Sequence, residues 1–336
     1  MKRLKKLLLI IFIIVILFGL MYALPKPKYR NDNIWLKENN DNKVLVMAHG
    51  GGQGYYPSNT MAAFKNSYNL GVDVLEMDVQ MTKDNILVLR HGENKTGNIR
   101  HMSNCDTVIW KENYQDLYET CNFGYNYLNS DDEYPYRDMT SQEWIEAEVY
   151  LTKLEDLFIE FGDSILYNIE IKADADAPRF ETADALYDLL SEYELIEETL
   201  VATSFDDISK YIVDKYPDIQ ISTSQKEAQK IIIPAYTLTS VFYTPGAYSA
   251  VQIPMSFGLP VIGSLNLSTK LLVSTLHRHN MAVHYWTIND EDQMRKLIEI
   301  GCDGIITDYP DILMNIINEW KKGQFSWPFL SLDYIF

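Results

Sequence analysis

Charged side chains recur at every second position in two apolar stretches of the sequence. Glu76 and Asp78 alternate in VDVLEMDVQ, and Glu170 and Lys172 alternate in ILYNIEIKAD. Alternate residues of a β-strand point to one face, so we expect each pair to share a face. Carboxylates at the ends of apolar strands need a positive charge to offset their burial. We predict that Glu76, Asp78 and Glu170 bind Ca²⁺ or Mg²⁺, which prefer oxygen ligands.

Two histidines each follow an apolar run that we expect to form a strand. His49 ends the run that begins at Val44, and His91 ends the run that begins at Ile86. An imidazole with its ordinary pKa of about 6.5 can hold or release a proton at neutral pH, which suits a general acid or base. Either histidine alone is more simply explained by a structural hydrogen bond. The two together, beside three carboxylates, favour catalysis.

Other residues near these positions could contact a phosphate group. Lys172 lies one pleat beyond Glu170 and would reach a phosphate, although a salt bridge between the two is the simpler alternative. Gly50 and Gly51 lack a Cβ, so their main-chain N–H groups could approach a phosphate closely. The second-line candidates for the site are Arg90 and His284.

The segments that must position these residues alternate between strand-like and helix-like patterns. Short apolar runs recur between residues 43 and 318, and stretches of helical periodicity separate most of them. Strand–helix alternation over about 270 residues is typical of a parallel sheet, and this length suits a TIM-type (β/α)8 barrel. Functional side chains of such barrels lie at the carboxyl ends of the strands. We therefore predict an α/β barrel over residues 43–318.

One region interrupts the alternation after the second barrel strand. Residues 97–150 are rich in Tyr, Asn, Asp and Glu. Because loops this long are usually functional or disordered, we predict an inserted loop or small subdomain. Cys105 and Cys121 lie within it and could form a disulfide outside the cell or remain free thiols. Cys302 lies in an apolar stretch and is expected to be buried.

The two ends of the chain differ from its middle. Residues 1–6 are a basic flank, and residues 7–24 carry no charge. At 1.5 Å per residue the uncharged segment would span about 27 Å, which is enough to cross a bilayer. We predict an uncleaved transmembrane anchor; the alternative is a cleaved signal peptide, for which no good small-residue cleavage site is present. Residues 25–42 are predicted to be a polar tether and residues 319–336 an aromatic tail that packs on the barrel.

Charge distribution limits the partners and the location of the chain. The basic flank should stay in the cytoplasm, which places the barrel outside it, at the cell membrane. The net charge is -18, and such a surface repels nucleic acid. A phosphate-bearing substrate would therefore need local positive charge, from a metal ion or from a few basic side chains.

Four blocks of the sequence together resemble the glycerophosphodiester phosphodiesterases, a family with a TIM-type barrel. The blocks follow one another in order within residues 43–318: AHGGGQGYYPSNTMAAF, GVDVLEMDVQMTKDNILVLRH, NIEIK and HYWTINDEDQMRKLIEIGCDGIITDYP. The resemblance implies a role for each matched residue: Glu76, Asp78 and Glu170 as metal ligands, His49 and His91 as the acid–base pair, Lys172 as a phosphate contact, and Trp286 as a wall of the substrate pocket.

The sequence departs from the family pattern at three positions. Gly50 stands where the family has arginine, Ser58 where it has glutamate, and Gly92 where it has aspartate. The arginine is the main positive charge that the family's protein chain offers to phosphate, and its absence removes a charge-assisted hydrogen-bonding group. Phosphate would then be bound by the metal ion, Lys172 and the main chain.

These observations predict a membrane-anchored, metal-dependent hydrolase that cleaves glycerophosphodiesters to glycerol phosphate and an alcohol. The substrate would be a small-molecule or lipid phosphodiester. Lysophospholipids or other lipid phosphodiesters are an alternative, because an anchored enzyme works close to a bilayer. A second alternative is a non-catalytic barrel that binds phosphate, which the three departures from the family pattern would explain.

Overall fold

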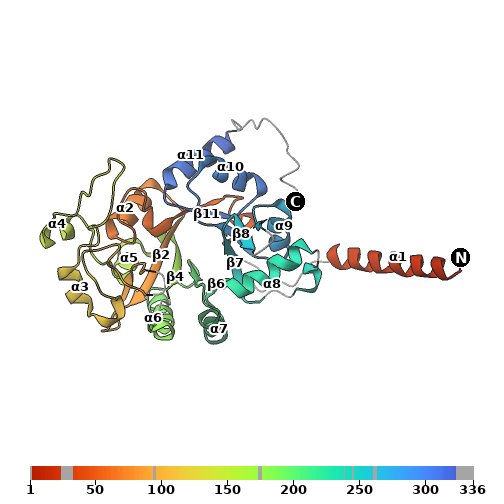
Figure 1. Cartoon of the computed structure of the whole chain (residues 1–336), viewed down its shortest axis with the longest axis horizontal. Coiled ribbons are helices and arrows are strands. Elements are labelled where there is room, and N and C mark those ends of the chain that lie inside the picture. The colour runs from red at the N-terminus through yellow and green to blue at the C-terminus, as the bar shows by residue number, and fades with distance from the viewer. Residues whose placement is uncertain are drawn as a thin grey trace.

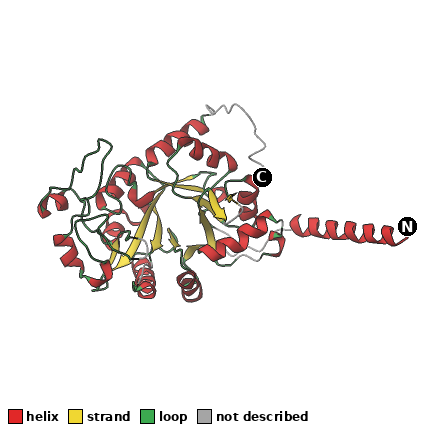
Figure 2. Ribbon diagram, viewed as in Figure 1, coloured by secondary structure: helices red, strands yellow, loops and turns green. Residues whose placement is uncertain are grey.

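Eight short apolar segments form parallel strands that close into a barrel (Figures 1 and 2). The computed structural model describes residues 2–23, 33–93, 96–172, 176–237, 239–243, 246–259 and 263–322. β1 pairs in parallel with both β2 and β11, and these pairings close the ring. The barrel strands are β1 (Leu45–Ala48), β2 (Val74–Met81), β4 (Leu166–Ile171), β5 (Thr199–Ala202), β6 (Gln220–Ser222), β7 (Tyr248–Ile253), β10 (Ala282–Tyr285) and β11 (Gly304–Thr307). The predicted TIM-type barrel is confirmed.

A helix follows each barrel strand and packs on the outside of the ring. These helices are α2 (Met61–Leu70), α5 (Leu154–Phe161), α6 (Arg179–Glu192), α7 (Asp206–Lys215), α8 (Gln225–Tyr236), α9 (Lys270–Arg278), α10 (Glu291–Ile300) and α11 (Pro310–Lys321). α10 shows how local sequence sets their limits. The Asp290 side chain accepts a hydrogen bond from the Gln293 N–H at its start, and Gly301, with φ of 92°, ends it in the left-handed region. Its apolar stripe, which includes Leu297, is buried against the barrel.

The register between β2 and β4 brings the predicted metal ligands to the same height. Asp78 is the direct partner of Glu170, and Glu76 is the partner of Asn168. All eight residues of β2 are buried, as expected for a parallel strand covered on both faces. The alternation of Glu76 and Asp78 therefore places both carboxylates on one face of the strand, beside Glu170 on the next strand.

The opposite end of the barrel is closed by residues that the sequence assigned to a tether. Trp35 and Leu36 are buried among side chains of the barrel strands, including Leu45 and Met47. The Asn33 amide donates hydrogen bonds to the carbonyl oxygens of Ser249 and Asn280. The tether prediction is wrong for these residues, because an apolar pair in a polar segment becomes part of the core. Residues 24–32, the rest of that segment, lie outside the described residues.

The insertion between β2 and β4 is a folded subdomain. Leu87–Leu89 (β3) pairs antiparallel with β2 and does not join the barrel ring. The helices α3 (Tyr114–Thr120) and α4 (Ser141–Glu146) follow it. A separate apolar cluster, centred on Ile99, Ile109 and Phe123, gives this region its own small core. The inserted segment is therefore ordered by its own packing and by the disulfide described below.

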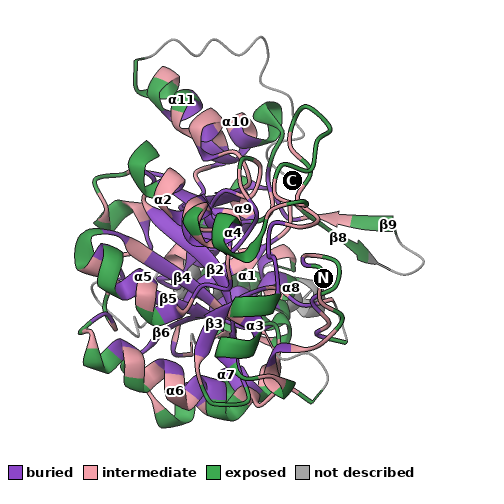
Figure 3. Cartoon of the chain, turned by 90° about the vertical axis from the view of Figure 1, so that its left-hand side faces the viewer, coloured by how far each residue is buried: buried purple, intermediate pink, exposed green. Residues whose placement is uncertain are grey.

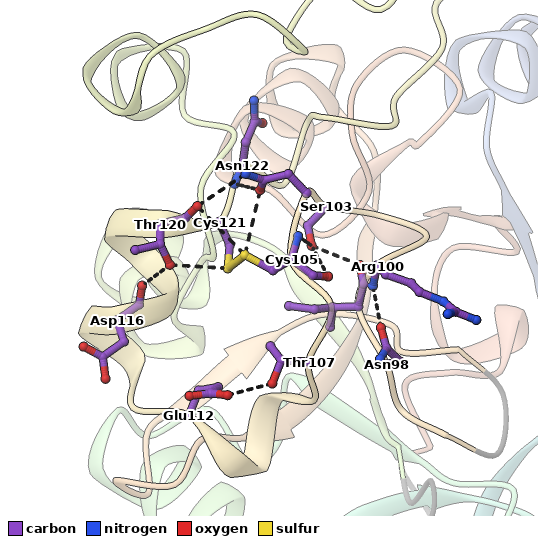
Figure 4. The surroundings of a disulfide bond; sticks show 12 residues. Asn98, Arg100, Ser103, Cys105, Thr107, Glu112, Asp116, Thr120, Cys121 and Asn122 are labelled. Atoms are coloured by element: carbon purple, nitrogen blue, oxygen red, sulfur yellow. Dashed lines mark hydrogen bonds between the residues drawn. A yellow bond between two sulfur atoms is a disulfide. The ribbon is translucent and has the colours of Figure 1, made fainter.

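A disulfide joins Cys105 and Cys121 within the insertion (Figure 4). The bridge ties the end of α3 to the segment that precedes it, and the Asn104 side chain accepts a hydrogen bond from the Asn122 N–H beside it. Of the two states left open by the sequence, the structure contains the disulfide. Cys302 is a free, fully buried thiol, as predicted.

Two further elements lie outside the barrel ring. The hairpin formed by β8 (Ser256–Leu259) and β9 (Gly263–Asn266) follows β7 and projects from the body of the protein (Figure 3). The sequence did not predict this hairpin. α1 (Lys2–Ala23) extends away from the barrel in Figure 1.

The predicted transmembrane anchor falls on α1. Several of its side chains lie outside the described residues, and no helix among those that are described is long and apolar enough to cross a membrane. The aromatic tail was predicted over 319–336; its part beyond Lys322 also lies outside the described residues.

Candidate active site

Three carboxylates meet at the carboxyl ends of β2 and β4. Glu76, Asp78 and Glu170 each offer an oxygen atom, and these three oxygens lie within 4.8 Å of one another. Glu76 and Asp78 are each 4% exposed. Burial of charges this close together is unfavourable without a compensating positive charge. The predicted set is therefore brought together by the fold, at the barrel end where such sites are found.

Two of the carboxylates are held in place by main-chain and amide groups from the loop after β1. The Gly50 N–H donates to Glu76 Oε2 at 2.8 Å. The Asn59 amide donates to Asp78 Oδ2 at 2.9 Å, and Asn59 Oδ1 accepts from the Asp78 N–H at 3.0 Å. Asn59 has φ of 60°, in the left-handed region that asparagine tolerates better than most residues. The sequence analysis did not identify Asn59 as a site residue.

Lys172 lies between Asp78 and Glu170 and contacts both carboxylates. Its Nζ is 2.9 Å from Asp78 Oδ1 and 2.8 Å from Glu170 Oε2. Burial alone would raise the pKa of Asp78, but the positive charges of Lys172, His91 and His49, with the hydrogen bond from Lys172, together outweigh it and lower that pKa to about 2. Lys172 thus forms the salt bridge that the sequence offered as the simpler alternative, and it does so inside the carboxylate cluster.

The positive groups around Glu76 do not offset the burial of its negative charge. Burial raises its pKa to about 7, and the negative charge of Asp78 acts in the same direction, against the opposing charge of His49. A lysine and a main-chain N–H thus do not fully offset this set of oxygens. Three carboxylate oxygens grouped at this spacing fit a hard divalent cation, which takes oxygen ligands. The residues that would hold it are Glu76, Asp78 and Glu170.

His49 is paired with a carboxylate from the last barrel strand. Its Nδ1 lies 2.6 Å from Asp308 Oδ1, and the Gln53 amide donates to the same oxygen at 2.9 Å. Asn289 donates to Asp308 Oδ2 at 2.6 Å. Burial disfavours the charged imidazole, but the charge of Glu76 and the hydrogen bond with Asp308 together raise the pKa of His49 to about 9.

Asp308 is a candidate site residue that the sequence analysis missed. It directly follows β11, which is the neighbour of β1 in the ring, so Asp308 and His49 follow adjacent strand ends. The block GIITDYP was recognised as part of the family resemblance without a role for its aspartate. Its position at a strand end, like that of His49, was the signal that could have found it.

His91 follows β3, at the edge of the insertion. Its positive charge is among those that lower the pKa of Asp78, which places it near the carboxylate cluster. Its ring lies edge-on to His101, with 6.5 Å between the ring centroids. The two predicted acid–base residues thus come from separate strand ends, and the charge of each acts on Asp78.

The sequence matches the glycerophosphoryl diester phosphodiesterase family over residues 49–312. The chain belongs to this family. It is 27% identical over 278 residues to a glycerophosphodiester phosphodiesterase of Bacillus altitudinis, a match that covers 82% of this chain and 99% of the relative. It is 23% identical over 297 residues to human lysophospholipase D GDPD3, covering 82% of this chain and 86% of the relative. The predicted phosphodiesterase class is confirmed by this membership.

A solved structure supports the same conclusion for the fold. The crystal structure of a glycerophosphoryl diester phosphodiesterase domain from Mycobacterium tuberculosis matches with a TM-score of 0.66 at 16% identity. The match covers 83% of this chain and 99% of that one. At this identity the comparison shows a shared barrel.

The glycine loop of this family member packs closely against the residues around it. The Gly50 N–H donates to Glu76, one of the three carboxylates. A Cβ on Gly50 would lie 2.9 Å from the Ser58 Cβ, and one on Gly51 would lie 2.9 Å from the Phe64 ring. These glycines allow the loop to pack closely against α2, and the main-chain contact of Gly50 and Gly51 with phosphate stays a prediction.

Both second-line candidates lie in the interior, where neither contacts the carboxylates. Arg90 is 2% exposed and donates hydrogen bonds to the carbonyl oxygens of Ser58, at 2.7 Å, and Met102, at 3.0 Å. It therefore fastens the insertion to the loop before α2. His284 is fully buried inside the barrel, with its ring 6.1 Å from that of Trp35.

A cavity of about 540 Å³ begins at the carboxylate cluster. Glu170 and Trp286 both line it, which agrees with the expectation that Trp286 forms a wall of the substrate pocket. Trp286 is 46% exposed and stands at its mouth. The volume lies within the range of about 300–1,000 Å³ that is usual for small-molecule sites.

Proposed function

We propose that the protein hydrolyses glycerophosphodiesters to glycerol phosphate and an alcohol with the help of a divalent cation. The observation that carries the proposal is the group of three carboxylate oxygens within 4.8 Å, placed beside a histidine that is hydrogen-bonded to a carboxylate. A cation bound there would polarise the phosphodiester and lower the pKa of the attacking hydroxyl. The family to which the chain belongs, and the name of its relative from Bacillus altitudinis, support glycerophosphodiesters as the substrate class.

His49 is suited to give a proton to the leaving alcohol. Asp308 binds Nδ1 and favours the protonated ring, so Nε2 is the nitrogen left to donate. Gln53 and Asn289 hydrogen-bond to Asp308 and hold that carboxylate in position. A positioned proton donor of this kind typically contributes about 10²–10⁴-fold to a rate.

His91 is the candidate for taking the proton from the attacking hydroxyl. It approaches the carboxylates from the insertion, whereas His49 approaches them from β1, so the two histidines can serve different oxygens of one phosphodiester. Lys172 places a positive charge between Asp78 and Glu170, which favours an anionic substrate. Together these residues offer phosphate the positive charge that an arginine at position 50 would have supplied.

We further propose that the barrel works outside the cytoplasm at the cell membrane. The Cys105–Cys121 disulfide supports an oxidising compartment, because disulfides rarely persist in the cytosol. The uncharged segment 7–24 behind a basic flank supports attachment to the membrane. Two separate measurements test this location: fractionation of lysed cells, which should recover the protein with the membranes, and protease treatment of intact cells, which should cleave the barrel. Cleavage of the barrel only after lysis would contradict the proposal.

Product analysis tests the proposed activity. The full chain is incubated with glycerophosphocholine and either Ca²⁺, Mg²⁺ or a chelator. We expect glycerol phosphate and choline to form only with a cation. No turnover while a cation still binds would favour the non-catalytic barrel, and a cyclic phosphate product would point to a different phosphodiester cleavage.

A further inference from the structure

We propose that the cavity beside Glu170 binds a single long aliphatic chain of the phosphodiester substrate. This inference rests on the proposed hydrolase activity and narrows its substrate class. The chain could be attached to the glycerol, as in a lysophospholipid, or could form the leaving alcohol. Both cases place a phosphodiester at the carboxylates and an aliphatic chain in the cavity.

The wall of the cavity nearest the carboxylates is formed by residues at the carboxyl ends of the barrel strands. Glu170 and Gln252 lie near the ends of β4 and β7, and Thr203 and Thr223 directly follow β5 and β6. Apart from Glu170 these groups are neutral hydroxyls and amides. Thr223 Oγ is buried and has no hydrogen-bond partner among the described residues. A glycerol hydroxyl could supply that partner, since buried polar groups are normally hydrogen-bonded.

The remaining wall is mostly apolar, and its largest apolar side chains come from elements outside the barrel ring, although Gln225 and Gln229 of α8 also line it. α8 contributes Ile232 and Ile233, and the β8–β9 hairpin contributes Phe257 and Leu265. Leu267 follows the hairpin and completes this side. No basic side chain is among the lining residues in the part of the chain that the structure describes. A second charged group would be desolvated here without a partner, whereas an alkyl chain would bury apolar surface.

The mouth of the cavity carries exposed apolar side chains. Ile233 is 59% exposed, Phe257 is 39% exposed and Trp286 is 46% exposed. All three line the cavity, so its apolar surface continues to the outside of the protein. A chain that extends from the carboxylates past α8 would cover these side chains. The cavity thus joins Glu170, through a part lined by hydroxyls and amides, to apolar side chains that reach solvent, as a single chain attached to a phosphodiester requires.

Chain length gives the first test. Two series of monomeric substrates are compared with the full chain, each running from butyl to dodecyl. One carries the chain as an acyl group on glycerophosphocholine, and the other carries it as the alcohol esterified to glycerol phosphate. We expect kcat/KM to rise with each methylene in at least one series, by up to about fourfold per methylene until the cavity is filled. The series that rises identifies which side of the phosphodiester carries the chain.

A charge at the cavity mouth gives the second test. Ile233→Glu places a carboxylate on the apolar wall at an exposed position, so the fold should be retained. The matched control is Ile159→Glu, since Ile159 is 67% exposed on α5 and does not line the cavity. We expect Ile233→Glu to lower kcat/KM for the dodecyl substrate by about tenfold or more, with glycerophosphocholine hydrolysis unchanged. Ile159→Glu should change neither.

Several outcomes would overturn the aliphatic-chain proposal, and they differ from failure of the proposed activity. Hydrolysis of glycerophosphocholine with no dependence on chain length in either series would remove the chain proposal and leave the hydrolase intact. An equal loss on both substrates in Ile233→Glu would also contradict it. If no phosphodiester is hydrolysed, calorimetric titration with monomeric dodecylphosphocholine decides: binding that Ile233→Glu weakens supports the cavity, and absence of binding rejects it.

Discussion

At the scale of single residues, the side chains that bind the carboxylates and the histidine were harder to foresee than the carboxylates themselves. Alternation along each strand is local and predicts which side chains share a face, and the expected barrel, with its site at the carboxyl ends of the strands, was enough to predict that Glu76, Asp78 and Glu170 meet. Asp308 lies 259 residues from His49 in sequence. Nothing local in either segment indicates that pairing, which depends on β11 lying beside β1 in the closed ring.

Removing the charge of Asp308 should alter how activity depends on pH. Asp308→Asn keeps the size of the side chain but no longer stabilises a protonated His49, so the pKa of His49 should fall from about 9. If His49 gives its proton to the leaving alcohol, activity is lost as pH rises through that pKa. We expect the alkaline limb of the kcat/KM profile to move to lower pH and the maximum to fall about tenfold to a hundredfold.

The control for this variant is Asp311→Asn. Asp311 accepts a hydrogen bond from the Tyr55 hydroxyl at the surface, at 2.6 Å, and does not contact His49. Its profile should match that of the unaltered protein. A lower rate in Asp308→Asn with an unmoved alkaline limb would show that Asp308 only supports the fold.

At the scale of elements, strands and helices of the barrel followed from periodicity, whereas the insertion did not. Each barrel strand is an apolar run, and each outer helix has an apolar stripe that the ring buries. α3 has 7 residues and α4 has 6, too few for a clear helical pattern. The β8–β9 hairpin was missed for a different reason: its strands, SFGL and GSLN, contain serine and glycine and form no apolar run, and β9 is exposed or half-buried. Its place beside the cavity gives it a role that its sequence alone does not indicate.

The disulfide should stabilise the insertion by restricting its unfolded chain. Cys105 and Cys121 are 16 residues apart, and closing a loop of this length stabilises a fold by about 3 kcal/mol in the chain-entropy description. The double variant Cys105→Ser/Cys121→Ser should therefore unfold at lower denaturant concentration. A reducing agent should shift the unaltered protein toward the variant and leave the variant itself unchanged. Equal stability of the two oxidised proteins would contradict the expectation.

At the scale of the whole molecule, the barrel has a reactive end and a closed end. The carboxylates, His49 and the cavity lie at the carboxyl ends of the strands, whereas Trp35 and Leu36 fill the opposite end. The sequence predicted the barrel and its reactive end. It did not predict the closed end, because Trp35 and Leu36 stand in a polar, proline-containing segment and become apolar core only when the ring is formed.

His284 should make the stability of the barrel sensitive to acid. Burial lowers its pKa to about 4 in the folded protein, compared with an ordinary value of 6.5. The unfolded chain therefore binds a proton that the folded chain does not, between these two values. The contribution of the neutral His284 ring to the free energy of unfolding is complete above pH 6.5 and is lost as pH falls toward about 4. The total loss is on the order of 3 kcal/mol.

Urea unfolding measured at several pH values between neutral pH and about pH 4 tests this dependence. His284→Gln removes the titrating ring, so its free energy of unfolding should fall less steeply over the same interval. The comparison concerns the slope with pH, since the substitution also changes packing against Trp35. Identical slopes for the two proteins would show that His284 is not the source.

Calorimetric titration of Ca²⁺ or Mg²⁺, with hydrolysis of glycerophosphocholine measured in parallel, tests the central claim most directly. The account predicts one cation site whose occupancy follows the rate, and loss of both in Glu76→Gln with the fold retained. Glu119→Gln, on the surface of the insertion, should behave as the unaltered protein. Hydrolysis that continues in the presence of a chelator, or full activity in Glu76→Gln, would contradict a catalytic cation held by Glu76, Asp78 and Glu170.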